Sequence, residues 1–176
     1  MNAKSPLPTW PQQIHRILSA AGVCQVAYVP DAGHTRLIEL CRSDKTMKTV
    51  VLTTEEEGIA MLAGAWLGGE RGALLMQSSG AGNCINMLGM IQECRFPLLA
   101  LVTMRGEWGE FNPWQVPMGR ATAPVLEQLG VIVQHVDEAA RVAETVFAAS
   151  QLAFNAYRAV AVLIGQRVVG FKNWER

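Results

Sequence analysis

Short apolar runs alternate with longer amphipathic segments along nearly all of this 176-residue sequence. Strands that alternate with helices at such spacing form a parallel sheet covered on both faces. The runs are continuously apolar, as in Ala-Val-Ala-Val-Leu-Ile at 159–164, which is typical of strands buried on both sides. We therefore predict an α/β fold: a single doubly wound domain over residues 1–176, with about six parallel strands and helices on both faces of the sheet.

The pattern places each element approximately. The predicted strands cover residues 23–29, 49–53, 73–77, 98–103, 131–134 and 159–164. The predicted helices cover residues 9–22, 34–42, 55–67, 80–93 and 137–157. Between the fourth and fifth strands we expect a long loop from 104 to about 122, followed by a short helix.

Composition limits the partners. Only 17% of the residues are charged and the formal net charge is zero, which argues against nucleic acid as a partner. Half of the residues are hydrophobic, a high share for one domain. The alternatives are a well-packed monomer and a chain whose apolar surface is covered by another subunit. We expect a partner chain, and self-association as well.

The same sequence argues against a membrane or secretory protein. No stretch approaches the roughly 20 apolar residues of a membrane helix, and residues 1–6 lack the apolar segment of a signal peptide. The four cysteines, Cys24, Cys41, Cys84 and Cys94, show neither a CxxC pair nor zinc spacing. We expect a reduced, cytoplasmic protein without metal ligands of its own.

In doubly wound folds, ligands bind at the carboxyl ends of the strands. Four predicted strand exits carry polar or glycine-rich segments, namely 30–34, 53–58, 77–83 and 104–119. Because the strands are expected to be parallel, these four segments should converge on one rim of the sheet.

Three consecutive glutamates, Glu55, Glu56 and Glu57, follow the second strand. Helix capping is one explanation, because carboxylates in a first turn complement the helix dipole. Capping does not explain the small-residue face that follows, which would admit another helix or a flat ligand. This face comprises Gly58, Ala60, Ala63, Gly64 and Ala65.

The segment Gln77-Ser78-Ser79-Gly80-Ala81-Gly82-Asn83 is a glycine-rich turn from strand to helix, and its backbone N–H groups suit an anion. It lacks the lysine of a Walker loop and the register of GxGxxG. It is also not the G-x-S-x-G elbow of a serine hydrolase, because the first glycine is missing.

Segment 104–119 is too long for a plain connection and contains two tryptophans and a phenylalanine. It is either an interface or binding lid, or an Ω-loop packed on its own aromatics. His34 is the one histidine on a strand exit, where a solvated or capping role is the alternative to catalysis. His15 and His135 lie on predicted surface elements and receive no role.

Three segments together resemble the alpha subunit of sulfopyruvate decarboxylase and the first domain of phosphonopyruvate decarboxylase, which are thiamin-diphosphate enzymes. They are Glu55-Glu56-Glu57-Gly58 with Ala63-Gly64, Met76 to Asn83, and Arg105-Gly106-Glu107 continuing to Gln115 and Met118-Gly119. The resemblance covers most of the chain and identifies it as a pyrimidine-binding domain of this class.

The resemblance implies roles for particular residues. Glu55, nine residues before Gly64, matches the glutamate that hydrogen-bonds the aminopyrimidine ring and promotes its imino tautomer. Further cofactor contacts would come from Gln77, Ser78, Gly80 and Asn83. The substrate, a small 2-keto acid with a second anionic group, would be contacted by residues among Asp31, His34, Arg105, Gln115 and Arg120. Ala32-Gly33 departs from the polar residue that relatives carry after Pro-Asp, which leaves the exact keto acid open.

The resemblance also implies a missing half. In this family the diphosphate and its Mg²⁺ are held by a domain with Gly-Asp-Gly and a downstream asparagine, and no Gly-Asp-Gly occurs here. We therefore expect a separate beta subunit, with thiamin diphosphate at the interface between the two chains.

Other functions stay open at this level. A non-catalytic metabolite- or nucleotide-binding domain would have the same fold, as would a regulatory subunit. A carboligase or an oxidoreductase would use the same cofactor, because the pyrimidine domain does not determine the fate of the intermediate.

Overall fold

The computed structural model describes residues 9–171, so the segment 1–6 discussed above lies outside the described residues. Its centre is one six-stranded sheet in the order β2-β1-β3-β4-β6-β5. Every neighbouring pair is parallel, which confirms the predicted doubly wound α/β fold. The strands are β1 Val23–Tyr28, β2 Lys48–Val51, β3 Arg71–Gln77, β4 Leu98–Thr103, β5 Ile132–Val136 and β6 Ala159–Ile164.

Helices connect the strands. They are α1 Trp10–Ala20, α2 Thr35–Ser43, α3 Glu55–Leu67, α4 Ser78–Ala81, α5 Ile85–Cys94, α6 Gln115–Gln128, α7 Val142–Ala156 and α8 Gln166–Val169. Short 3₁₀ turns η1 Ala32–His34, η2 Gly82–Cys84 and η3 Ala139–Arg141 precede α2, α5 and α7.

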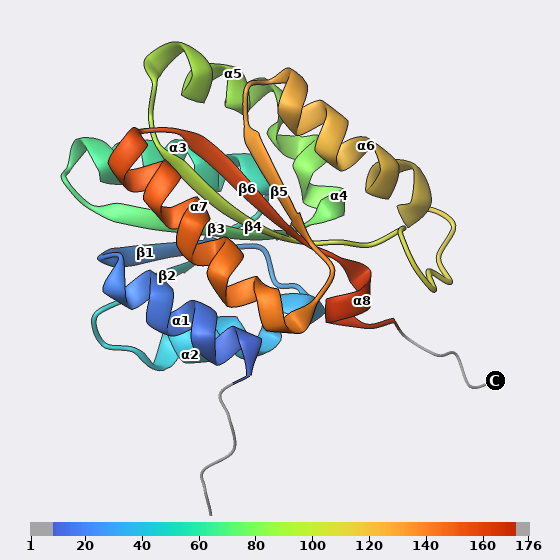
Figure 1. Cartoon of the computed structure of the whole chain (residues 1–176). Coiled ribbons are helices and arrows are strands. Elements are labelled where there is room, and N and C mark those ends of the chain that lie inside the picture. The colour runs from blue at the N-terminus through green and yellow to red at the C-terminus, as the bar shows by residue number, and fades with distance from the viewer. Residues whose placement is uncertain (1–8, 172–176) are drawn as a thin grey trace, which may run out of the picture.

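The helices form two layers around the sheet (Figure 1). One layer holds α1, α2 and α7, and the other holds α3, α5 and α6. Successive strand residues alternate between the two cores. Leu75 packs with the first layer and Leu74 with the second, for example, and both are fully buried. This burial on both sides is why the strands are continuously apolar in sequence.

The segment after β4 differs from the prediction. We expected a loop to about residue 122, but it ends at Trp114 and α6 begins at Gln115. Pro117 and Gly119 favour a loop locally, but Pro117 falls in the first turn of α6, where its missing N–H is not needed. Pro124 is also accommodated inside this helix.

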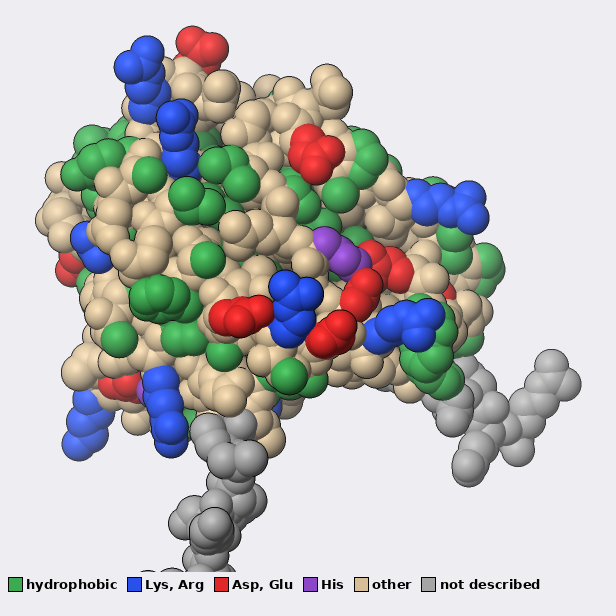
Figure 2. Space-filling view, in the orientation of Figure 1, with side chains coloured by type: hydrophobic (Ala, Val, Ile, Leu, Met, Phe, Trp, Pro, Cys, Tyr) green, Lys and Arg blue, Asp and Glu red, His purple; other side chains and the backbone are tan. Residues whose placement is uncertain are grey.

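Two other predicted helices are interrupted. The helix expected at 80–93 is divided into α4, η2 and α5, and the one expected at 137–157 begins as the turn η3. The four-residue helix α8, which follows β6, was not predicted. No helix within residues 9–171 is long and apolar enough to cross a membrane. On the face seen in Figure 2, acidic and basic side chains are interspersed rather than gathered by sign.

Candidate cofactor and substrate site

Glu55 begins α3 at the carboxyl end of the sheet, and its side chain turns inward. The residue is only 6% exposed. The amide Nδ2 of Asn83 donates a hydrogen bond to Glu55 Oε2 at 2.8 Å. A buried carboxylate needs such a partner, because burial without one is costly. Within the described residues the second oxygen, Oε1, accepts no hydrogen bond, so it remains available to a ligand.

Gly80 forms the floor beneath this carboxylate. A β-carbon at residue 80 would overlap the carboxyl group of Glu55, so only glycine fits there. Cys84 lies behind the pair. Burial raises the pKa of its thiol to about 12, and the negative charges of Glu55 and Glu56 act in the same direction. Cys84 is therefore a neutral thiol and not a nucleophile.

The three glutamates have separate roles. Glu57 is exposed, and its Oε2 accepts a hydrogen bond from the backbone N–H of Thr53 at 2.9 Å, which is a capping contact at the start of α3. Glu56 is partly buried, and only Glu55 is buried. Capping thus explains Glu57 but not Glu55.

Asp31 joins the exits of three neighbouring strands, β1, β3 and β4. Its Oδ1 accepts a hydrogen bond from Gln77 Nε2 at 2.8 Å. Its Oδ2 accepts hydrogen bonds from Thr103 Oγ1 at 2.5 Å and from the Gly33 N–H at 3.1 Å. The sequence analysis did not select Thr103, although a polar residue that ends an apolar strand was a usable signal.

Ser78 ties the glycine-rich turn to the segment after β4. The residue is fully buried, and its hydroxyl oxygen accepts the backbone N–H of Arg105 at 3.0 Å. Two of the predicted cofactor residues, Gln77 and Ser78, therefore hold neighbouring loops in place through their side chains.

Arg105 forms a two-point ion pair with Glu110. Its Nε and Nη2 donate to the two carboxylate oxygens of Glu110, each at 2.6 Å. This pairing holds the pKa of Glu110 at about 2, against the opposing effect of its burial. A guanidinium held this way has little capacity left for a substrate anion, although Arg105 was a predicted substrate contact.

Gln166, on the unpredicted helix α8, secures the same segment. The residue is 1% exposed. Its Oε1 accepts the backbone N–H groups of Glu107 and Trp108, at 3.0 and 3.1 Å. Its Nε2 donates to Glu110 Oε2 at 3.0 Å. We missed it because the sequence analysis did not treat the exit of β6 as a rim segment.

Three other predicted substrate contacts take no part in the hydrogen bonds of the Asp31 carboxylate, although His34 is close to it in the same turn. The His34 ring is fully buried and its Nε2 donates to the Leu101 carbonyl at 3.0 Å. Burial lowers the pKa of His34, so the ring is neutral and faces the core rather than the rim. Arg120 is exposed on α6. Gln115 has a buried side-chain oxygen with no partner among the described residues.

Close approach of two segments explains another pair of glycines in the motif. A β-carbon on Gly119 would overlap the Arg105 carbonyl, and one on Gly106 would overlap the carbonyl of Gln115. The chain leaving β4 therefore crosses the start of α6 at backbone contact. This crossing fixes the position of α6 beside the glycine-rich turn.

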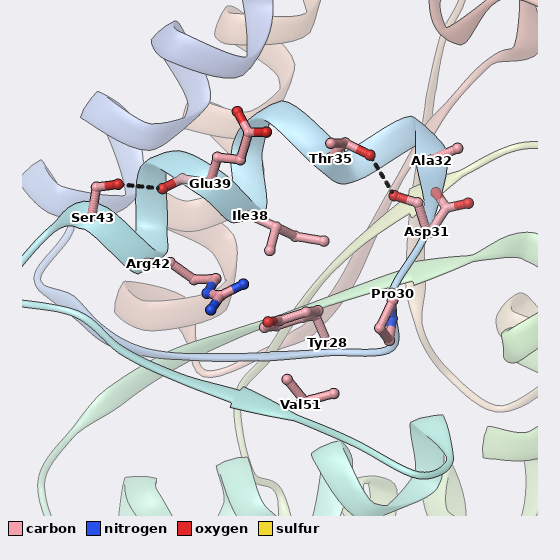
Figure 3. Close-up of a pocket in the computed structure, with 10 residues that line it drawn as sticks. All are labelled: Tyr28, Pro30, Asp31, Ala32, Thr35, Ile38, Glu39, Arg42, Ser43 and Val51. Carbon is pink, nitrogen blue, oxygen red and sulfur yellow. Dashed lines mark hydrogen bonds between the residues drawn. The ribbon is translucent and has the colours of Figure 1, made fainter.

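A hollow of about 840 Å³ opens beside Asp31, beneath α2 (Figure 3). It is bounded by α2 above and by the ends of β1 and β2 below. The lining residues are Tyr28, Pro30, Asp31, Ala32, Thr35, Ile38, Glu39, Arg42, Ser43 and Val51. Asp31 therefore lines this cavity in addition to making hydrogen bonds within the protein.

Comparison with known proteins identifies the family of this chain. The family model described as "Thiamine pyrophosphate enzyme, N-terminal TPP binding domain" matches residues 9–111, which include Asp31, Glu55 and the glycine-rich turn. This chain belongs to that family.

Named members align over most of the chain. The "Sulfopyruvate decarboxylase subunit alpha" of Methanococcus maripaludis is 34% identical over 157 residues, which are 87% of this chain and 92% of the relative. The protein of the same name from Methanothermobacter thermautotrophicus is 32% identical, over 87% of this chain and 93% of the relative. The chain is therefore a homologue of sulfopyruvate decarboxylase alpha subunits, and the predicted resemblance is confirmed.

Longer relatives contain the same unit as one part. The "Phosphonopyruvate decarboxylase" of Streptomyces viridochromogenes is 39% identical over 112 residues, which are 62% of this chain but 28% of that protein. Among solved structures, a 2-oxoglutarate:ferredoxin oxidoreductase from Magnetococcus marinus matches with a TM-score of 0.71 at 15% identity, covering 92% of this chain and 29% of that one. The second match shows a shared fold alone.

Proposed function

We propose that this chain is the pyrimidine-binding subunit of a thiamin-diphosphate-dependent decarboxylase, and that its substrate is a 2-keto acid with a second anionic group. The observation that carries the proposal is the carboxylate of Glu55: it is buried, held by Asn83, set against Gly80, and has one free oxygen. A ring nitrogen of an aminopyrimidine is a suitable partner for that oxygen.

The residues of the rim fit this cofactor. Thiamin diphosphate, when bound, supplies the electron sink for decarboxylation. Glu55 would bind and orient its pyrimidine ring, while Asn83 fixes the carboxylate and Gly80 leaves room for it. Asp31, with both oxygens already hydrogen-bonded, would face the substrate as a fixed negative charge. The partner chain would complete the pocket and exclude water.

We propose a separate partner subunit that carries Gly-Asp-Gly and holds the diphosphate and Mg²⁺. Two of the relatives are named as alpha subunits, which supports a two-chain enzyme. An apolar patch beside the rim supplies a candidate contact surface: Trp114 is 85% exposed, and Pro113, Pro117, Met118 and Ala121 surround it. Exposed aromatic anchors of this kind are typical of interfaces. We also propose self-association and a cytoplasmic location, which agrees with four unpaired cysteines.

The first experiment is to tag this chain, purify it from its native cells and identify stoichiometric partners by mass spectrometry. We expect a chain with Gly-Asp-Gly and a downstream asparagine. The recovered complex should then release CO₂ from sulfopyruvate or phosphonopyruvate only when thiamin diphosphate and Mg²⁺ are present. A chain that is recovered alone and binds no cofactor would favour the non-catalytic binding domain instead.

A further inference from the structure

Arg42, in the last turn of α2, is a cation without a counter-ion. Within the described residues its guanidinium makes no ion pair and no hydrogen bond. Of the two carboxylates near it in sequence, Asp44 accepts hydrogen bonds from His15 and Thr46. Glu39 is paired with Arg36, with Nη1 and Oε2 3.0 Å apart. Figure 3 shows the Glu39 carboxylate directed away from the hollow and the Arg42 guanidinium directed into it. Arg42 is therefore an exposed, unpaired positive charge at one end of the hollow, while the carboxylate of Asp31 lies at the other end.

Tyr28, the last residue of β1, adds a second donor to the same hollow. The residue is only 3% exposed, yet its hydroxyl has no hydrogen-bond partner among the described residues. The hydroxyl itself reaches the hollow, where it can donate a hydrogen bond to a ligand. Both Tyr28 and Arg42 line the hollow, and Figure 3 shows the hydroxyl end of Tyr28 and the guanidinium of Arg42 pointing into it. Two unpaired donors that converge are suited to an anion.

The hollow connects these donors with the rim. It is lined by Asp31 and Ala32 at one end and by Arg42 at the other. Side chains on a helix point back toward its N-terminus, so the guanidinium of Arg42 extends from the last turn of α2 toward Asp31. Ile38 contributes a buried apolar wall between the two ends of the hollow.

We propose that this hollow receives the distal anionic group of the keto acid, with Arg42 as its counter-ion and Tyr28 as a second donor. This inference rests on the proposed function and deepens it, because it names the residues that select a substrate with two anionic ends. Arg105, whose guanidinium is held by Glu110, is not free for this role. Arg42 acts on binding and specificity, not on the bond that breaks.

The test compares two substrates in the complex of this chain with its partner. Replacing Arg42 by glutamine should raise the KM for sulfopyruvate about 10- to 100-fold, the range lost with a charged hydrogen-bonded contact. The kcat/KM for pyruvate, which has no second anionic group, should stay within about twofold. Arg42→Lys should keep part of the effect, because an ammonium retains the charge but not the planar donor pair. Sodium sulfate should inhibit the wild-type complex competitively and the Arg42→Gln complex much less.

The matched control is Arg158→Gln, which removes an exposed arginine just before β6, at the amino ends of the strands and so away from the rim of the site. Neither KM should change there. If Arg42→Gln leaves the KM for sulfopyruvate unchanged, or lowers activity on both substrates equally, the inference is overturned while the proposed function stands. If the wild-type complex decarboxylates neither keto acid, the proposed function fails, and this inference fails with it.

Discussion

The carboxyl group of Glu55 lies directly over the α-carbon of Gly80, with no space between them for a methyl group. One residue opens a helix after β2 and the other lies in the turn after β3, so two strand exits meet at this contact. The contact makes the position of a buried carboxylate depend on the absence of a side chain 25 residues away. It also yields a test of the site that leaves every polar group in place.

Gly80→Ala should move the Glu55 carboxylate and lower turnover of the proposed two-chain complex by at least about tenfold, because displacement of a catalytic group, the role proposed for Glu55, by an ångström has large effects. The control is Gly89→Ala, since a β-carbon there meets nothing within 4 Å. That change should leave turnover unaltered and stabilise α5 by about 0.5–1 kcal/mol. Steady-state rates of both variants measure the effect on turnover, and thermal melts measure the effect on stability. Equal turnover in the two would show that Glu55 tolerates displacement.

Glu55→Gln should lower kcat by at least about 100-fold, the range that proton-transfer groups contribute. The change keeps the size of the side chain and a hydrogen-bonding oxygen, so folding should be preserved. Glu57→Gln is the matched control two residues along, because its carboxylate caps the backbone of Thr53 and does not face the rim. Turnover within about threefold of wild type is expected there. Unchanged turnover in Glu55→Gln would remove Glu55 from the mechanism.

Asn83→Asp should be more harmful than Asn83→Ala. The aspartate would place a second carboxylate beside Glu55 Oε2, where the amide now donates at 2.8 Å. Two carboxylates that share a site do not both ionise easily, so one pKa rises. We expect the pH–rate profile of Asn83→Asp to shift relative to wild type, whereas Asn83→Ala should lower the rate without a comparable shift. A pH–rate profile of unchanged shape in Asn83→Asp would contradict the contact between residue 83 and the Glu55 carboxylate.

Acid should unfold the wild-type chain partly through Glu110. Its pKa is held at about 2, chiefly by the hydrogen bonds from Arg105. A depressed carboxyl pKa stabilises the fold above the ordinary value near 4.5, and this stability is lost as pH falls toward 2. Urea midpoints measured across that window should fall less steeply in Glu110→Gln than in wild type. Parallel curves would indicate that the pair contributes nothing to acid stability.

His135 should give the opposite pH dependence of stability to that of Glu110. The hydrogen bond to Glu107 raises its pKa above the usual 6.5, with a further effect from Asp137, against the opposing effect of burial. A raised histidine pKa stabilises the fold below pH 6.5, and that stability is lost as pH rises through the folded-state pKa. The side chain is 40% exposed, so the effect should be modest. An NMR titration should give a midpoint above 6.5 in wild type, and a normal midpoint in Glu107→Gln would support this pairing.

Much of the fold was predictable from local patterns. The bounds of α3, β4 and β6 agree with the prediction to the residue, because each is a continuous apolar or helical run between clear breaks. The start of α6 was not predictable in the same way. Pro117 and Gly119 indicate a loop by their intrinsic preferences. Their places in a first turn and at a backbone crossing depend on where the chain leaving β4 lies.

The candidate site also contains one part that local sequence patterns predict and one part that depends on the sheet order. Glu55 could be selected because its proposed role is linked to a local motif, a glutamate after a strand with a glycine at a fixed offset. The hydrogen bonds of Asp31 with Gln77 and Thr103 depend on the order of strands β1, β3 and β4, which brings together residues separated by 46 and 72 positions. No local pattern specifies such a sheet order, because it results from how the helices pack on both faces.

The arginines show what the sequence determines and what only the tertiary structure determines. By itself the sequence determined the alternation of strands and helices, the family motifs and the position of Glu55. Glu39 lies three residues from both Arg36 and Arg42, so helical spacing permits either pair. Only the tertiary structure decided that Glu39 pairs with Arg36, that Glu110 holds Arg105, and that Arg42 faces the hollow unpaired. The physical reason is that the periodicity of a sequence specifies which face of an element is buried, while the partner of a charged group depends on which surfaces the packed elements bring together.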